Sequence, residues 1–334
     1  MNRIILSTTL ALAATPFAMH GEDSTDNPNR FFFGPRFGMN FKADFRNNAS
    51  YFNAVNPGPV AGGADHTYND GYVLVDSSGN AGGLTWNWGY QNSSQVVGNT
   101  VAMQFHAIQS SSPSSATDNP QYGAELVYQR VIGHLPSSSG CWGLETGFGF
   151  TDLDLRENRS GTVSVTTDTF QLNGVLPPSA GYNGTFSGPG ALLGDTPTRT
   201  TESAALTSNQ KLSGQLFSIR LGPFAELNFT PKLSFDASVG LTLAPTTLDY
   251  DFSETVALAG GGTFAASGHS SKTELLYGPY VGGMLRYAFN KCWGVYVGAQ
   301  FQNLTDLEQS VGGHTARLDP GATVYGTVGV SWSF

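Results

Sequence analysis

The sequence predicts an all-β fold that closes as an antiparallel transmembrane β-barrel, and three observations support this prediction. Segments of about ten residues alternate apolar and polar side chains with a period of two, which is the pattern of a two-sided strand. Aromatic residues lie at the ends of the apolar faces, where a barrel meets the membrane interface. Short turns alternate with long connections rich in Gly, Ser, Thr and Asn, as on the two rims of such a barrel.

The composition agrees with this fold and excludes several others. Of the 334 residues, 12% are charged, 12% are aromatic and 42 are glycine, so the chain is neither disordered nor collagen-like. The 16 basic and 25 acidic residues give a net charge of −9, which disfavours nucleic acid as a partner. No apolar run approaches the roughly 20 residues of a membrane-spanning helix.

Residues 1–21 predict a secretory signal peptide. Arg3 provides the positive charge, Ile4 to Ala14 form a short apolar stretch, and small residues precede the polar Glu22. We therefore expect the protein to be exported, with a barrel domain that covers residues 22–334.

Eight segments share the alternation. In the first, Phe33, Phe37 and Phe41 lie on the apolar face, while Gly, Arg, Asn and Lys residues lie on the other face. Because long and short connections alternate, an even number of strands returns the chain to the rim from which it started. The eight predicted strands are 31–42, 121–133, 141–155, 213–229, 232–250, 273–289, 292–303 and 322–334.

The first long connection leaves the strand count open. It contains two further alternating stretches, Leu84 to Tyr90 and Val101 to Ala107. These stretches are interpreted either as an extracellular β-extension or as two more spanning strands. Eight strands is the prediction, and ten or more is the alternative.

The two cysteines allow at most one disulfide. Cys141 and Cys292 each precede a tryptophan of an apolar face, so a period of two directs both thiols to the interior at the periplasmic rim. They lie on the third and seventh predicted strands, on opposite sides of the barrel, whereas a disulfide needs Cα atoms about 5.5 Å apart. We predict two unbridged thiols.

The last segment resembles the C-terminal signal strand of Gram-negative outer-membrane barrels. Val328, Val330, Trp332 and Phe334 occupy alternate positions, with an aromatic residue last. By its alternation, the chain is similar to the small OmpA/OmpX-type barrels with long surface loops. The resemblance implies localisation in the cell outer membrane, with the lipid bilayer and lipopolysaccharide as surroundings. It also implies that the barrel assembly machinery reads the last strand as an assembly signal, and it brings no activity with it.

Eight charged residues lie on the polar faces of the predicted strands, four of each sign. An eight-stranded barrel has room inside only for side chains, and unpaired charges there are costly. We interpret these residues as an ion-pair network that plugs the lumen, and the alternative is a charged constriction of a small pore. They are Arg36, Lys42, Glu125, Glu145, Arg220, Glu226, Asp236 and Arg286.

The long connections, at about 43–120, 157–211, 253–272 and 304–321, are predicted to be extracellular loops, and we expect any surface ligand to bind there. The sequence therefore predicts a structural or surface-interaction role, and a porin-like diffusion channel for small solutes is the alternative.

No catalytic, metal or cofactor site is predicted. The chain contains no phosphate-binding loop, zinc-ligand spacing or dinucleotide fingerprint, so we expect no metal and no cofactor. His269 precedes Ser270, but neighbours on one flexible stretch do not form a nucleophile–base pair by themselves. We therefore expect that the protein is not an enzyme.

Overall fold

The computed structural model describes residues 28–47, 64–75, 82–107, 114–117, 120–135, 140–174, 181–257 and 263–334. In these ranges the chain forms β-strands and one short 3₁₀ turn, η1 (Ser93–Gln95). No helix among these residues has the length and apolarity to cross a membrane. The predicted signal peptide lies outside the described residues.

Eight antiparallel strands pair into a closed ring. Their order is β10-β1-β20-β17-β16-β15-β14-β11, and β11 also pairs with β10, which closes the circle. Each segment with the predicted alternation contributes one strand to this ring. The strands are β1 (Asn29–Met39), β10 (Gln121–His134), β11 (Gly140–Asn173), β14 (Thr198–Asn228), β15 (Leu233–Ala257), β16 (Thr263–Ala288), β17 (Trp293–Gln302) and β20 (Thr323–Ser333).

Side chains on the ring strands alternate between the outer surface and the lumen, as a period of two requires. On β14, Ile219 and Leu221 are 43% and 62% exposed, while Ser218 and Arg220 beside them are buried. Apolar side chains therefore cover the outside, and the inside holds mostly polar side chains together with a small apolar cluster that includes Phe32 and Val127. A water-soluble protein has the opposite arrangement.

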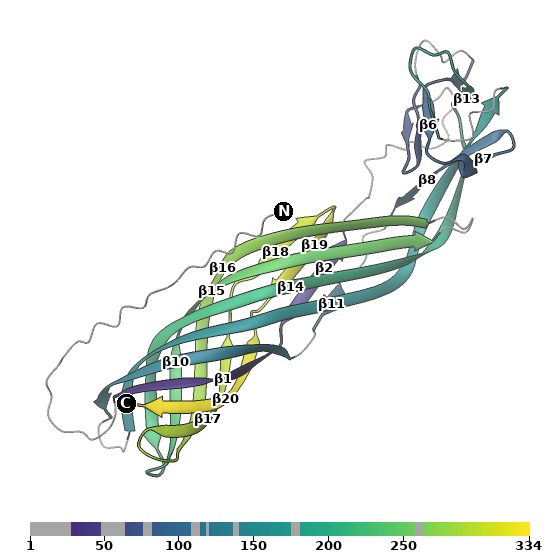
Figure 1. Ribbon diagram of the computed structural model, residues 1–334. Helices are drawn as coiled ribbons and strands as arrows, with labels where there is room; N and C mark the ends of the chain where they lie inside the picture. The colour runs from purple at the N-terminus through teal and green to yellow at the C-terminus, as the bar shows by residue number, and fades with distance from the viewer. Residues whose placement is uncertain are drawn as a thin grey trace.

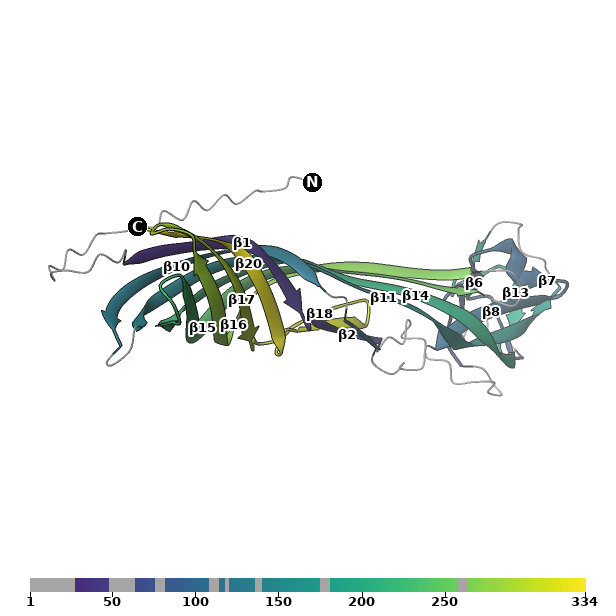
Figure 2. The same ribbon diagram turned by 90° about the horizontal axis from the view of Figure 1, so that it is seen from below.

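Four ring strands continue far beyond the ring. β11, β14, β15 and β16 have 34, 31, 25 and 26 residues, whereas β17 has 10. At about 3.3 Å per residue β11 is about 110 Å long, although about 10 residues suffice to cross a membrane. The four strands form one long sheet that leads away from the ring (Figures 1 and 2). Much of the regions 157–211 and 253–272 is therefore strand.

A smaller sheet packs against the inner face of this extension. It has the order β18-β19-β2-β9 and comprises β2 (Lys42–Asn47), β9 (Ser114–Ala116), β18 (Leu307–Val311) and β19 (His314–Asp319). Phe45 and Leu318 from the small sheet share one buried apolar core with Leu212 and Leu248 from the long sheet. We call the two packed sheets the stalk.

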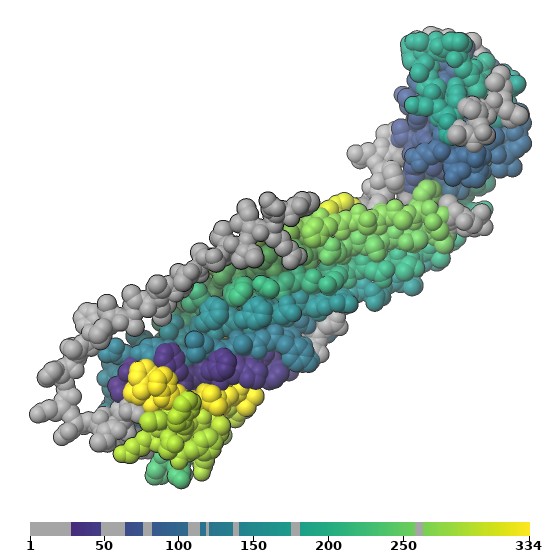
Figure 3. All heavy atoms as spheres, in the orientation of Figure 1, coloured from purple at the N-terminus to yellow at the C-terminus, as the bar shows by residue number. Residues whose placement is uncertain are grey.

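The far end of the long sheet carries a separate group of short strands, which we call the head (Figures 1 and 3). One four-stranded sheet has the order β12-β6-β4-β3, and β8 pairs with the end of β11. The stretches 84–90 and 101–107 belong to the head, so they form an extension and not two more ring strands. The head strands are β3 (His66–Thr67), β4 (Gly71–Val73), β5 (Leu84–Thr85), β6 (Trp88–Tyr90), β7 (Val96–Val97), β8 (Thr100–Ala107), β12 (Tyr182–Asn183) and β13 (Leu192–Gly194).

The cysteines are unbridged, as predicted, but only one points inward. Cys141 is buried inside the ring on β11, whereas Cys292 is exposed. Cys292 lies in the turn before β17, where the Asn290 side chain accepts hydrogen bonds from the backbone N–H groups of Cys292 and Trp293. The alternation begins only at Trp293, so it does not direct the side chain of the turn residue.

This difference predicts selective labelling. In the folded protein a maleimide is expected to modify Cys292 and to leave Cys141 unmodified, because ring side chains cover Cys141. Mass spectrometry of the intact protein should count one label in the native state and two after unfolding. Two labels in the native state would show that the lumen near Cys141 is open.

Candidate functional site

The charged side chains of the lumen gather around Arg220, halfway along the ring. The Arg220 guanidinium donates from Nη1 to Glu125 Oε2 at 2.6 Å and from Nε to Glu145 Oε1 at 3.1 Å. Its Nη1 also donates to Gln300 Oε1 at 2.5 Å, and Gln129 Nε2 donates to the other Glu145 oxygen at 3.0 Å. All five side chains are fully or almost fully buried. One arginine thus bridges two carboxylates of the neighbouring strands β10 and β11 inside the lumen.

Glycines on the inner face make room for these large side chains. A Cβ on Gly147 would lie 2.6 Å from Arg220 Nε, and one on Gly149 would lie 2.0 Å from Arg36 Nη1. Non-bonded heavy atoms do not approach each other this closely, so a Cβ at either position would displace the arginine. The alternation of glycine with apolar residues on β11 therefore provides the space into which the two arginines extend.

A second charged group lies nearer the C-terminal end of the ring. Arg30 forms an ion pair with Glu226 through both guanidinium nitrogens, and Asp236 lies opposite Glu226 on β15. Arg286 donates to the hydroxyls of Ser331 at 3.2 Å and Ser333 at 2.9 Å. Arg30, Glu226 and Arg286 are thus paired at this end of the lumen, whereas neither carboxylate oxygen of Asp236 has a hydrogen-bond partner among the described residues.

Arg36 differs from Arg30 and Arg220 because no described carboxylate lies within ion-pair distance of its guanidinium. Its Nη1 donates to Ser218 Oγ at 2.9 Å, and its Cζ lies 3.3 Å from the centroid of the Tyr325 ring. Its Nε and Nη2 have no hydrogen-bond partner among the residues that the structure describes. A cation–π contact with the Tyr325 ring offsets part of the cost of burying the Arg36 charge.

Seven of the eight residues expected in the lumen lie there, and Lys42 does not. Asn40 has φ of 64°, in the left-handed region, and this breaks the strand between β1 and β2. Phe41 turns into the apolar core of the stalk, although the alternation places it on the lipid face. The Lys42 side chain is 44% exposed and pairs with Asp44 at 2.9 Å. Placing Lys42 in the lumen was therefore wrong.

Arg30, at the start of β1, is the fourth arginine in the lumen, and the predicted set of charged residues does not include it. It was missed because the predicted strand begins at residue 31, whereas β1 begins at Asn29. Residues 30, 32, 34 and 36 share one face of a strand, so a predicted strand that began two residues earlier would have placed Arg30 in the lumen with Arg36. The lumen charges still balance, since four arginines face four carboxylates: Arg30, Arg36, Arg220, Arg286, Glu125, Glu145, Glu226 and Asp236.

The outside of the ring carries an aromatic belt at each end. Near the C-terminal end, Trp293 and Trp332 face each other on neighbouring strands, with ring centroids 6.3 Å apart. At the other end, Phe150 and Phe217 pair in the same way at 5.3 Å. A closed, even-numbered ring with an apolar exterior, aromatic belts and a polar interior defines one class of protein. The ring is an outer-membrane β-barrel. Its last residue, Phe334, exchanges two backbone hydrogen bonds with Asn29.

A scan against known protein families finds no match to the chain, and no curated protein matches it. Among solved structures, the barrel shows similarity to the outer-membrane protease OmpT of Escherichia coli, with 12% identity, a TM-score of 0.32 and coverage of 92% of this chain and 97% of that chain. It is also similar to Ail of Yersinia pestis, determined with the heparin analogue sucrose octasulfate (8% identity, TM-score 0.21, 90% and 99% coverage). The toluene transporter TodX of P. putida gives 9% identity, a TM-score of 0.20, and 93% and 91% coverage. Likenesses this distant do not bear on activity.

The head of the barrel protein has a charged cluster of its own. Asp168 on β11 accepts two hydrogen bonds from Arg199, at 2.7 and 2.6 Å, and one from the Tyr68 hydroxyl at 2.6 Å. Burial lowers the pKa of the fully buried His66, and it raises the pKa of the Asp70 carboxyl to about 6. The cluster joins the long β11–β14 hairpin to the first connection.

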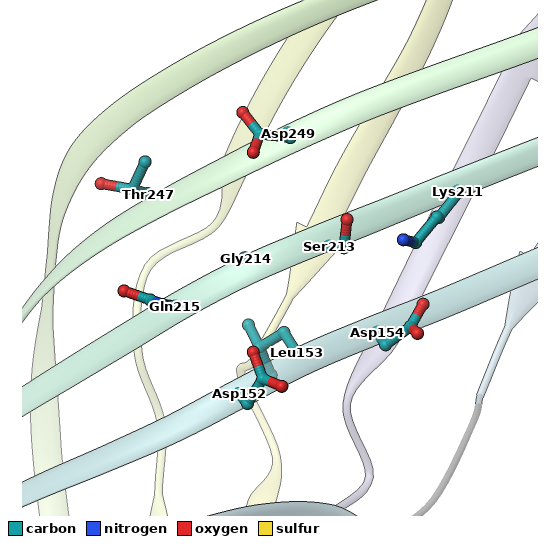
Figure 4. A pocket seen from close by; sticks show the side chains of 9 residues that line it. All are labelled: Asp152, Leu153, Asp154, Lys211, Ser213, Gly214, Gln215, Thr247 and Asp249. Atoms are coloured by element: carbon teal, nitrogen blue, oxygen red, sulfur yellow. The ribbon is translucent and has the colours of Figure 1, made fainter. Parts of the chain in front are cut away.

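A shallow recess lies on the outer surface of the long sheet, where the sheet leaves the ring (Figure 4). It spans β11, β14 and β15 and has a volume of about 430 Å³, within the range of small-ligand pockets. No sequence signal marked it, because its residues are adjacent only through strand pairing. Its lining residues are Asp152, Leu153, Asp154, Lys211, Ser213, Gly214, Gln215, Thr247 and Asp249.

Proposed function

We propose that the protein is an eight-stranded outer-membrane barrel that anchors the stalk and displays the head at the cell surface, where the head binds other molecules. One observation carries this proposal: four of the eight ring strands continue without a break into the stalk, as the 34-residue β11 does. A barrel that only had to close a ring would need about 10 residues in each strand.

The contents of the lumen favour an anchoring role over diffusion of solutes. Arg220 on β14 contacts Glu145 on the neighbouring β11 and Gln300 on β17, three strands away around the ring, and Glu145 is 0% exposed. Beyond them, Tyr325 and Leu276 belong to the apolar core of the stalk, which lies over the mouth of the ring. The lumen side chains therefore act as a plug, and we do not assign them to a pore constriction.

The head has the features of a separately packed binding module. It has a core of its own, which includes Trp88, Met103 and Phe170 at 0% exposure. Rigid scaffolds commonly carry binding surfaces at the tips of their connections. In this proposal the surroundings are the outer-membrane bilayer and its lipopolysaccharide, and the barrel assembly machinery reads Val328, Val330, Trp332 and Phe334.

Conductance in planar bilayers tests the plugged interior. The purified, folded protein is expected to produce no conductance steps, because buried ion pairs cross the lumen at Arg220 and at Arg30. A general porin reconstituted in the same bilayers is the positive control. Regular conductance steps from the folded protein would instead favour the diffusion channel.

Labelling of intact cells tests the display of the head. Val97 is 68% exposed, in the β7–β8 hairpin at the far end of the molecule. A membrane-impermeant maleimide is expected to label Val97→Cys on intact cells. The wild-type protein is the matched control, because its exposed Cys292 lies at the opposite, periplasmic rim. Labelling of Cys292 on intact cells, with Val97→Cys protected, would show the reverse orientation.

A further inference from the structure

The four-stranded sheet of the head (Figure 1) has one buried face and one face that is open to solvent. Trp88 and Tyr90 of β6 lie on the buried face, in the core of the head, whereas Gly89 between them faces the other way. Strand pairing places one residue from each strand in a row on that second face, which we call the open face. The row is Thr67 on β3, Tyr72 on β4, Gly89 on β6 and Asn183 on β12.

The Tyr72 side chain lies across the open face, over Gly89. Its hydroxyl donates to Asn183 Oδ1 and lies 3.0 Å from the Gly184 carbonyl oxygen, so the ring reaches from β4 over β6 to β12. A Cβ on Gly89 would lie 2.7 Å from Tyr72 Cε1 and 2.9 Å from Tyr72 Cζ. Glycine at position 89 therefore provides the space for the ring, which is held at both ends and is partly exposed to solvent.

Amide side chains flank this ring. Asn87 and Gln91 lie two residues before and two residues after Gly89, and a period of two therefore places them on the open face. The Asn87 side chain makes no hydrogen bond with a described residue. Gln91 donates from Nε2 to the Asn69 carbonyl at 3.2 Å, which leaves its amide oxygen as an acceptor. Asn183 accepts from Tyr72 and keeps its amide N–H groups as donors.

The open face is uncharged. The strands β3, β4, β6 and β12 contain no Asp, Glu, Lys or Arg. The carboxylates next to them along the chain, Asp65 and Asp70, accept hydrogen bonds from the backbone N–H groups of Val75 at 2.6 Å and Gln104 at 2.8 Å. A surface of this kind does not compensate the desolvation of a charged ligand. It suits a neutral ligand that has an apolar side and several hydroxyl groups.

We propose that the open face binds a neutral saccharide. The electron-rich face of the Tyr72 ring attracts the C–H groups on one side of a pyranose. The amides of Asn87, Gln91 and Asn183 exchange hydrogen bonds with the sugar hydroxyls, because an amide both donates and accepts, as a hydroxyl does. The inference deepens the proposed function, since it names the class of molecule that the head binds, and it rests on the display of the head outside the cell.

Binding of the purified full chain, in detergent, to an array of neutral oligosaccharides tests this proposal. Sialylated and sulfated oligosaccharides on the same array are the charged comparison, and we expect binding to neutral members. Tyr72→Ala is expected to reduce the affinity for the best-bound neutral oligosaccharide about tenfold, because the stacking ring is lost. Tyr277→Ala is the matched control with unchanged binding, since it removes a tyrosine that is 60% exposed on the outside of β16.

Asn87→Ala tests the site without removing the ring. Because the Asn87 side chain makes no hydrogen bond with a described residue, its loss leaves the sheet intact. We expect a loss of affinity of about fivefold, which corresponds to one neutral hydrogen bond. This variant decides the question even where Tyr72→Ala disturbs the folding of the head.

Unchanged binding by both Tyr72→Ala and Asn87→Ala would overturn the proposal. Binding of the wild-type protein to charged oligosaccharides alone, or to none on the array, would overturn it as well. Neutral oligosaccharide binding without labelling of Val97→Cys on intact cells would refute the display of the head and leave the saccharide site standing. Labelling of Val97→Cys without oligosaccharide binding would refute the saccharide site alone.

Discussion

Replacing Arg220 by methionine is expected to destabilise the folded barrel by about 3–5 kcal/mol, the cost of breaking a buried ion pair. Arg220 is the ion-pair partner of both Glu125 and Glu145 in the lumen. Without it, two carboxylates remain buried and face no cation at hydrogen-bond distance. The free energy of unfolding in urea, measured by tryptophan fluorescence in detergent, gives the effect directly.

Arg36→Met is the matched control for this experiment. It removes the same functional group from the same lumen, but Arg36 has no described carboxylate partner and two of its nitrogens have no hydrogen bond. We expect Arg36→Met to cost less than Arg220→Met, because Arg36 has only a longer-range attraction to Glu125 and no carboxylate at hydrogen-bond distance. Equal destabilisation by the two variants would show that the lumen charges act as a diffuse field and not as discrete pairs.

Leu221→Arg is expected to cost about 2–4 kcal/mol of folding free energy in a bilayer, as charged residues do at the midplane on the lipid face of a barrel. Leu221 is 62% exposed on the outside of β14, near the middle of the ring. The same unfolding titration, carried out in lipid vesicles, measures the cost.

Asn209→Arg introduces the same charge on the same face of the same strand. Asn209 pairs with Asn158 and Ser253 in the stalk, 12 residues from Leu221 and beyond the ring. Water surrounds the arginine there, so we expect a change of less than about 0.5 kcal/mol. Similar costs at the two positions would place the membrane boundary elsewhere on β14.

The ring was predictable because each of its strands follows one simple rule over many residues. The alternation is unbroken where a strand has lipid on one side and a polar lumen on the other, as around Arg220 and Leu221. The rule fails where the environment changes. At Asn40 the backbone turns, and the same alternation continues into a sheet where apolar residues such as Phe41 face inward.

The partners of the lumen charges could not be predicted from the sequence. The sequence shows equal numbers of positive and negative residues on the polar faces, but not which of them form ion pairs. Arg220 pairs with two carboxylates, whereas Arg36 pairs with none among the described residues. These contacts depend on the stagger of strands far apart in the chain. Only part of the head was predictable. The stretches 84–90 and 101–107 show the alternation, whereas strands such as His66–Thr67 are too short to show a period.

The continuous pairing of β11 with β14 has a mechanical consequence. Residues 140–169 pair with 198–227 without a break, from the C-terminal rim of the ring to the base of the head. Because the head lies at the closed end of this hairpin, a pull on the head loads β11 and β14 together, and the shear falls on the many backbone hydrogen bonds that join them to β10 and β15. Since the ladder has no hinge between membrane and head, a force on the head is transmitted to the barrel wall itself.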